Sequence, residues 1–393
     1  MPKTRRVRTV LLVGVAVLVW GLVFEGIARA LLAAVPALRP AAETRHHADA
    51  YAGAAWARGY WDEFAASSRM RWAPYTYWRR APYAGRYIRV DSAGVRASWR
   101  PPATARPPTG RPFRVWFFGG STLWGTGARD AHTIPSEVAR RLTARAGRPV
   151  EAVNFGESGY VSGQEIVYLQ RLLVEGDRPD AVVFYDGIND SFAAFQSGHA
   201  GWPSNEANRA DEFAFFRDAG AGAFFGRGLR VAAAGSGLGR LAAALTADRR
   251  EAARHRAQGA RYPPEDAERL AADAVRVYGA HVRLAEALAA ADSFAIRFYW
   301  QPAAFTKRAL TPYEAGALRP DAYFAPFHAR TVAALRASAL VRAGRVRDLS
   351  AILDTAAVPL YVDFAHLAEA GNARVAAAIA ADLAPLVASG GRP

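Results

Sequence analysis

The stretch Phe113-Arg-Val-Trp-Phe-Phe-Gly-Gly-Ser-Thr122 decides the fold. Its apolar run from Arg114 to Phe118 is typical of a short strand, and the two glycines that follow end that strand in a tight turn. A serine directly after such a turn stands at the start of a helix, where its backbone N–H can point at a forming oxyanion. The stretch is not a phosphate loop, because no lysine precedes Ser121.

From this stretch onward, strand patterns alternate with helix patterns. This alternation predicts a mainly parallel sheet covered by helices on both sides, with sites at the carboxyl ends of its strands. Residues of about 191–265 interrupt the rhythm with polar loops and an alanine-rich helical stretch, and we expect an insertion that covers the site. The other expected strands are 149–154, 180–185 and 294–300, and the expected helices are 134–145, 163–175, 264–291 and 373–387.

Three further polar segments stand at strand or loop ends. Asn154-Phe-Gly-Glu-Ser-Gly159 and Asp186-Gly-Ile-Asn-Asp190 each follow an expected strand, and Asp363-Phe-Ala-His366 lies at a loop-to-helix junction. A neutral amide such as that of Asn189 can stabilise a negative oxygen without adding a full charge. A carboxylate three residues before a histidine can reach Nδ1 and leave Nε2 free as a base. Each segment alone also fits an ordinary turn or helix cap.

Taken together, the four segments present Ser, Gly, Asn and His in that order. The set resembles the SGNH/GDSL hydrolases, a superfamily of esterases and lipases named for those four residues. The resemblance covers roughly 113–196 and 292–388. It departs from the founding motif at Gly120, where that motif has Asp, and at the insertion.

The resemblance implies a three-layer α/β/α fold with a mainly parallel sheet, of the flavodoxin-like SGNH-hydrolase type. It implies that Ser121 is the nucleophile, that His366 activates it and that Asp363 orients His366. It also implies an oxyanion hole made by the backbone N–H groups of Ser121 and Gly159 and the side-chain amide of Asn189.

Two residues after a later strand, Trp300 and Gln301, are candidates for a substrate pocket or for an ordinary strand exit. We expect no cofactor and no metal, because the adjacent pair His46 and His47 lacks the helical spacing of a zinc protease. The chain has no cysteine, which excludes disulfides, Cys-ligated zinc and a Cys nucleophile.

The pattern at the N-terminus indicates an export signal. Basic residues precede an apolar run from Thr9 to Phe24, which is slightly short of the roughly 20 residues that span a bilayer, and Glu25 can sit at the far interface. An uncleaved signal anchor competes with a signal peptide cleaved near Ala33–Ala42, and we favour the anchor because the run is long for a signal peptide. The basic residues before it predict a cytoplasmic N-terminus.

An aromatic and arginine-rich segment follows. Between Tyr51 and Tyr87 there are 11 aromatic residues, and between Arg69 and Arg114 there are 11 arginines and one acid. The segment fits contact with anionic lipid headgroups or an anionic glycan, but also simple packing on the main domain with solvated arginines. Pro101–Pro112 reads as a linker.

The net charge of +15 is weak evidence for a nucleic-acid partner. Of 50 basic residues only Lys3 and Lys307 are lysine, which looks like a coding bias toward arginine. With an export signal also present, we expect no nucleic-acid binding, and the sequence does not favour a dimer over a monomer.

The expected organisation is a cytoplasmic basic tail, a transmembrane signal anchor, an aromatic lead-in with a linker, and an SGNH hydrolase domain. These cover residues 1–8, 9–35, 36–112 and 113–393. The expected location is the inner membrane, single-pass, with the catalytic domain in the periplasm; if the N-terminal segment is cleaved, the protein is secreted.

The expected function is an exported serine esterase that hydrolyses O-acyl esters, either O-acetyl groups on a glycan or lipid esters, through an acyl-enzyme. The alternative is an O-acetyltransferase that modifies an envelope or extracellular polysaccharide, since the two differ only in what attacks the acyl-enzyme. A third hypothesis is a non-catalytic envelope scaffold.

Overall fold

The computed structural model describes residues 3–35, 45–102, 111–218, 220–246, 263–318 and 324–389. They fall into two units. The sheet unit comprises Arg45–Ala207 and His255–Pro393, and the N-terminal unit comprises Met1–Thr44 and Asn208–Arg254. Each unit is described by itself.

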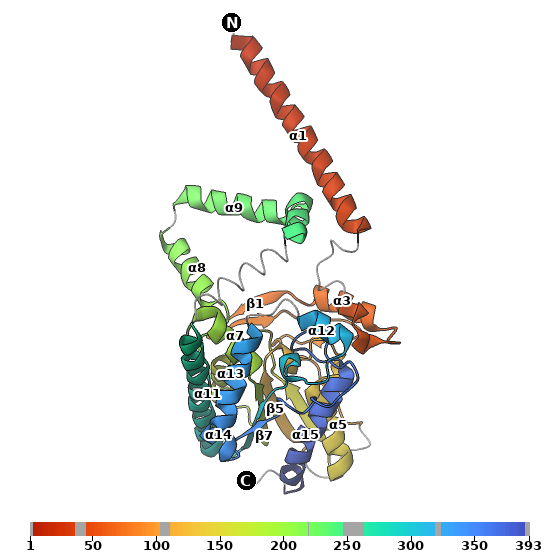
Figure 1. Ribbon diagram of the computed structural model, residues 1–393, viewed down its shortest axis with the longest axis vertical. Coiled ribbons are helices and arrows are strands. Elements are labelled where there is room, and N and C mark those ends of the chain that lie inside the picture. The colour runs from red at the N-terminus through yellow and green to blue at the C-terminus, as the bar shows by residue number, and fades with distance from the viewer. Residues whose placement is uncertain are drawn as a thin grey trace. The chain divides into compact units, whose positions relative to one another are not determined.

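A five-stranded parallel sheet forms the centre of the sheet unit, in the order β6-β5-β7-β8-β9. Figure 1 labels two of its strands, β5 and β7, among the helices that surround them. β5 pairs with both β6 and β7, which sets Phe117 beside Asn154 and Gly119 beside Tyr185. The carboxyl ends of three strands therefore meet next to the Gly-Gly turn. The strands are β5 (Phe113–Gly119), β6 (Val150–Asn154), β7 (Ala181–Asp186), β8 (Ala295–Trp300) and β9 (Val346–Asp348).

Helices cover both faces of this sheet, because side chains along each strand alternate between two apolar clusters. Val115 and Phe117 of β5 belong to one cluster, and Trp116 and Phe118 to the other. The first cluster is closed by α5 (Ile134–Ala146) and α15 (Glu369–Ala388), and the second by α6 (Ser162–Val174), α11 (Pro264–Asp292), α13 (Phe324–Ala337) and α14 (Ala339–Arg342). The predicted three-layer α/β/α fold is confirmed.

Beyond the lead-in, the remaining helices of the sheet unit are short. Two of them, α4 and α7, directly follow strands β5 and β7. They are α4 (Ser121–Trp124), η5 (Asp130–His132), α7 (Ile188–Ser197), η6 (Ala304–Thr306) and α12 (Pro312–Leu318).

The aromatic lead-in belongs to the sheet unit from Arg45 onward. Tyr60 and Trp61 are buried in one cluster with Trp124 and Val362, which confirms the interpretation that this segment packs on the main domain. Its elements are η2 (Arg45–His47), η3 (Asp49–Tyr51), α3 (Ala57–Ala66), β1 (Met70–Ala73), β2 (Tyr77–Arg80), β3 (Tyr83–Ala84) and β4 (Arg89–Val90).

We expected the lead-in arginines to be solvated, and for three of them this expectation is wrong. Arg79, Arg80 and Arg96 are buried. The guanidinium groups of Arg80 and Arg96 lie 3.8 Å and 4.0 Å from the centre of the Trp124 ring. These cations therefore hold the lead-in against the helix that begins at Ser121. The linker expected at Pro101–Pro112 lies outside the described residues over 103–110.

The N-terminal unit contains α1 (Lys3–Ala34), most of α8 (Glu206–Asp218), α9 (Ala221–Gly235) and a helix over 237–246. Among the described residues one helical stretch, Leu11–Ala34, is long and apolar enough to cross a membrane, a property that signal sequences share.

The insertion expected at about 191–265 is divided between the two units. Residues 191–207 belong to the sheet unit, whereas Asn208–Arg254 group with the N-terminal helix. Residues 219 and 247–262 of this stretch lie outside the described part of the chain. A cover over the site stays a prediction.

Candidate active site

Ser121 is the first residue of α4, immediately after β5 and the Gly-Gly turn. Gly120 caps the helix in an extended conformation, and the helix ends after one turn at Gly125, whose φ is +99°. The first N–H groups of a helix have no partner inside it, so the backbone N–H of Ser121 is free of the helical ladder. The side chain of Ser121 is partly exposed at the carboxyl end of the sheet.

Ser121, His366 and Asp363 form a continuous hydrogen-bonded chain. Nε2 of His366 lies 2.8 Å from Oγ of Ser121, although 245 residues separate the two along the sequence. Nδ1 of His366 lies 2.9 Å and 2.8 Å from the two carboxylate oxygens of Asp363. The side chains of His366 and Asp363 are largely buried, at 15% and 17% exposed. This geometry is that of a nucleophile, a base and a group that orients the base.

The electrostatics keep Asp363 ionised. Burial alone would raise the pKa of this carboxyl, but the neighbouring His366 and the hydrogen bonds from it lower the pKa well below its usual range. Oδ1 also accepts the backbone N–H groups of Ala365 at 3.0 Å and His366 at 2.8 Å. A fixed carboxylate on Nδ1 holds the proton there and turns the lone pair of Nε2 toward Ser121.

Arg45 is a second partner of Asp363, which the sequence did not single out. Its Nη2 lies 3.4 Å from Oδ2 of Asp363, and its guanidinium group lies 5.4 Å from the Trp61 ring. Its positive charge also lowers the pKa of Asp363. Arg45 comes from the start of the lead-in, far from Asp363 in sequence, so no local motif could have indicated the contact.

The candidate oxyanion donors Gly159 and Asn189 lie in the segments that follow β6 and β7, the two neighbours of β5. Gly159 has a φ of +74° in the loop after β6, and Asn189 lies in the first turn of α7 after β7. The Asn189 amide donates one hydrogen bond to the carbonyl oxygen of Tyr160 at 2.8 Å. An amide nitrogen carries two hydrogens, which leaves a second one for another acceptor. Both residues are partly exposed.

The lack of a side chain at position 120 is explained by the closeness of Asn189. A Cβ atom at position 120 would lie 2.1 Å from Nδ2 of Asn189, far inside contact distance. An aspartate there, as in the founding motif, would displace the Asn189 amide. Glycine at position 120, as in the Gly-Gly-Ser form of the motif, therefore leaves room for the Asn189 amide.

The expectation that Trp300 lines a substrate pocket is corrected by its burial. Trp300 is fully buried in β8, and its ring fills the space where a side chain at Gly187 would lie, with a Cβ 2.6 Å away. Because Gly187 has a φ of +126°, it allows the turn into α7 directly above this ring. Gln301 is also buried, and its Oε1 accepts a 3.3 Å hydrogen bond from Thr122. Both residues therefore support the turns on which Ser121 and Asn189 stand.

The loop that carries Gly159 is held by the lead-in residue Trp78. Nε1 of Trp78 donates to the carbonyl of Ser158 at 2.8 Å, and the Tyr160 hydroxyl donates to the carbonyl of Trp78 at 2.5 Å. A Cβ at Gly159 would lie 3.6 Å from the Trp78 ring. Aromatic richness in this segment was visible in the sequence, but this specific contact was not.

Three buried carboxyl groups lie beneath Asn189. Oδ1 of Asp190 accepts hydrogen bonds from the hydroxyl and backbone N–H of Ser162, at 2.6 Å and 3.2 Å, and so braces the start of α7. Burial raises the pKa of Asp186 to about 8 and that of Glu165 well above its usual value. At neutral pH the Asp186 carboxyl therefore keeps a proton that it would lose in water.

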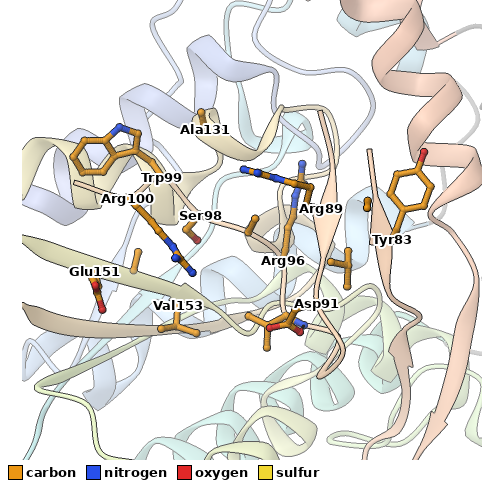
Figure 2. A pocket seen from close by; sticks show the side chains of 15 residues that line it. Tyr83, Arg89, Asp91, Arg96, Ser98, Trp99, Arg100, Ala131, Glu151 and Val153 are labelled. Carbon is orange, nitrogen blue, oxygen red and sulfur yellow. Dashed lines mark hydrogen bonds between the residues drawn. The ribbon is translucent and has the colours of Figure 1, made fainter. Parts of the chain in front are cut away.

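Among the described residues, no group of three or more His, Asp or Glu side chains is arranged to hold a metal ion. A cavity of about 840 Å³ lies along the edge strand β6, between the chain at Trp99 and Arg100 and that at Arg89 and Tyr83 (Figure 2). None of its lining residues is Ser121, Gly159, Asn189, Asp363 or His366.

No protein-family model matches the chain, and no curated protein matches it. It is similar to solved structures of an acetyl xylan esterase, the lipase/acylhydrolase from Enterococcus faecalis and a carbohydrate acetylesterase from Sinorhizobium meliloti. The identities are 13%, 14% and 14%, and the TM-scores 0.36, 0.35 and 0.35. The matches cover 69%, 69% and 70% of this chain and 99%, 95% and 99% of the other chains.

The parallel sheet with helices on both faces agrees with the fold that the four sequence blocks led us to expect.

Proposed function

We propose that the protein is a serine esterase that hydrolyses O-acyl esters through an acyl-enzyme. The observation that carries this proposal is the hydrogen-bonded chain from Ser121 Oγ through His366 to Asp363. Ser121 meets the local pair Asp363 and His366, of which His366 lies 245 residues further along the chain, in the order nucleophile, base and orienting carboxylate.

In the proposed first step, Oγ of Ser121 attacks the ester carbonyl carbon while Nε2 of His366 takes its proton. The carbonyl oxygen becomes an oxyanion that accepts hydrogen bonds from the backbone N–H groups of Ser121 and Gly159 and from Nδ2 of Asn189. His366 then gives its proton to the departing alcohol oxygen as the ester C–O bond breaks. An acyl group remains on Ser121.

In the second step, water attacks the acyl-enzyme, and His366 takes a proton from it. The tetrahedral intermediate forms again at the same donors and collapses as His366 returns a proton to Oγ of Ser121. The carboxylic acid leaves, and the enzyme is restored. Throughout, Asp363 stays ionised and stabilises the transient imidazolium ion.

For the location, we propose an inner-membrane protein with a single span over α1 and a periplasmic sheet unit. The basic residues before the apolar run favour a cytoplasmic N-terminus. The proposed substrates are O-acyl groups on an envelope glycan or a lipid, which are within reach of a domain exported in this way.

The test uses the full chain in detergent with p-nitrophenyl acetate, butyrate and octanoate, and then with an O-acetylated polysaccharide. We expect turnover that falls with acyl length for an acetylesterase and rises with it for a lipase. Release of acetate without an acceptor supports hydrolysis, whereas acetylated oligosaccharide formed without acetate release would replace it by the O-acetyltransferase alternative. A folded protein that neither releases acetate nor forms acetylated oligosaccharide would favour a non-catalytic scaffold.

A further inference from the structure

Helix α9 (Ala221–Gly235) is apolar yet exposed. Its side chains Phe225, Leu229 and Val231 are 75%, 64% and 66% exposed, and its two charged residues are Arg227 and Arg230. An apolar helix is normally buried, and an exposed apolar surface of this kind marks a binding surface.

The glycines of α9 strengthen this argument. The Cβ positions of Gly222, Gly226 and Gly228 have nothing within 4 Å, so these glycines do not serve close packing within the described chain. Each glycine also weakens a helix in water by about 1 kcal/mol relative to alanine. A helix of this composition is therefore expected to gain its stability from an external apolar environment.

The charge pattern indicates which environment this is. From 220 to 246 the chain carries three arginines, Arg227, Arg230 and Arg240, and no acidic residue. The next helix, 237–246, continues the pattern with exposed Leu238 and Leu245. Arg227 is paired with Glu212 of α8, whose Oε1 lies 3.0 Å from its Nη2. Apolar side chains interspersed with arginines fit the surface of an anionic bilayer, where Arg230 and Arg240 meet lipid phosphates and the apolar side chains meet acyl chains.

A contact inside the N-terminal unit connects this surface to the candidate membrane span. The backbone N–H groups of Gly237 and Leu238 donate to the Glu25 carboxylate at 2.6 Å and 3.1 Å, and Arg29 pairs with the same carboxylate at 2.8 Å. Glu25 is the one acidic residue of α1. The Glu25 carboxylate, which interrupts the apolar run, therefore finds its partners at the start of the 237–246 helix. These hydrogen bonds join that helix to α1.

The length of α9 decides how it can meet a membrane. Its 15 residues extend about 22 Å, which is less than the roughly 30 Å hydrocarbon core of a bilayer. We propose that residues 220–246 form an interfacial surface that lies in an anionic lipid bilayer and does not span it. This proposal is independent of the catalytic assignment of Ser121.

The test takes advantage of the absence of cysteine from the chain. Single cysteines are introduced as Phe225→Cys and Leu229→Cys in the full chain, labelled with the environment-sensitive dye NBD, and reconstituted in phosphatidylcholine–phosphatidylglycerol vesicles. The matched control is Ala144→Cys, at an exposed position of α5. Nitroxide-labelled lipid and aqueous iodide serve as the two quenchers, and circular dichroism verifies the fold of each variant.

We expect the probes at 225 and 229 to lose at least half of their emission to nitroxide lipid and to be several-fold less sensitive to iodide than the probe at 144. Removing charge with Arg230→Gln and Arg240→Gln should reduce the nitroxide quenching at 229 in anionic vesicles toward its level in pure phosphatidylcholine. Probes that iodide quenches as readily as the control would overturn the proposal. Probes protected from iodide but not quenched by lipid would also overturn it, because a protein surface would then cover the helix.

Discussion

The Asn189 amide is already fixed before a substrate arrives, because one of its hydrogens is donated to the Tyr160 carbonyl. Gly120 leaves the space in which this amide lies. A donor held in place in this way needs no reorganisation when the oxyanion forms, and preorganised donors of this kind are a large source of rate enhancement.

Replacing Asn189 by alanine should therefore reduce kcat by about 10²–10³. The side chain is partly exposed and makes one hydrogen bond to the described chain, so the thermal unfolding temperature should change little. Steady-state kinetics on p-nitrophenyl acetate and a melting curve measure both. An Asn189→Ala protein that folds normally and retains near wild-type kcat would show that this amide does not contact the oxyanion.

Arg45 should act as a positioning residue through Asp363. Loss of its charge in Arg45→Gln leaves Asp363 with a stronger pull on the His366 proton, so the acid limb of the pH profile of kcat/KM should move to higher pH. A partly exposed ion pair contributes about 0–1 kcal/mol, so the change in kcat/KM at neutral pH should stay within about fivefold. Arg45→Lys should restore the wild-type profile, and a profile unchanged in both variants would exclude this role.

At the residue scale, the sequence indicated the candidates that stand in motifs and missed those that act across the chain. Ser121 and Asn189 stand where a strand is followed by a helix, and Asp363 and His366 lie in the loop before α15, and such positions can be recognised locally. The roles assigned to them remain predictions until they are tested. Contacts such as that of Arg45 arise only from tertiary packing and leave no local pattern.

At the scale of elements, the expected strands and helices of the sheet agree closely with the observed ones. The strand expected at 180–185 is observed at Ala181–Asp186, and the helix expected at 264–291 at Pro264–Asp292. Strand β9 was not predicted, because Val346-Arg-Asp348 is too short to show a periodic pattern. The lead-in hairpin of β1 and β2 was also missed, since aromatic and arginine content obscured its alternation.

That hairpin supports the loop of Gly159 through the indole N–H of Trp78. Trp78→Phe keeps an aromatic ring but removes this hydrogen bond, which is worth about 0.5–1.5 kcal/mol, so kcat should fall by about two- to tenfold. Trp72→Phe in the same hairpin is the matched control, because Trp72 is largely exposed. Equal kcat values of Trp78→Phe and Trp72→Phe would mean that Trp78 does not position the loop that carries Gly159.

For the whole molecule, the sheet unit could be predicted from the sequence, whereas the composition of the N-terminal unit could not. The sheet unit has a layered apolar core that a pattern of alternating strands and helices can predict. The grouping of Asn208–Arg254 with the N-terminal helix could not be predicted, because it depends on which distant segments meet. Polar loops before the alanine-rich stretch made the whole region look like a single insertion.

The buried carboxyl groups of the sheet unit should make its stability depend on pH. The pKa of Asp186 is about 8 in the fold and near 3.8 in the unfolded chain, so between these values the fold holds a proton that the unfolded chain has released. This contribution is complete below about pH 4 and is lost as the pH rises toward 8. Asp363 has the opposite sign, but its lowered pKa places its effect at acid pH.

Asp186→Asn should therefore flatten the fall of the unfolding temperature between pH 5 and pH 8. The exposed Asp177→Asn is the control and should keep the wild-type slope. Thermal melts across this range, corrected for the nearby His281, measure the difference. Parallel slopes in the wild type and in Asp186→Asn would show that Asp186 does not keep its proton in the fold.

Activation of Ser121 as a nucleophile by His366 can be measured by its reaction with a serine-directed phosphonate. The full chain is incubated with a fluorophosphonate, and intact mass and peptide mapping locate the adduct in wild type, Ser121→Ala and His366→Gln. We predict one adduct on Ser121 in the wild type, no adduct in Ser121→Ala, and labelling slowed by several orders of magnitude in His366→Gln. An unlabelled wild type in its folded state, or an adduct that persists in Ser121→Ala, would contradict the account.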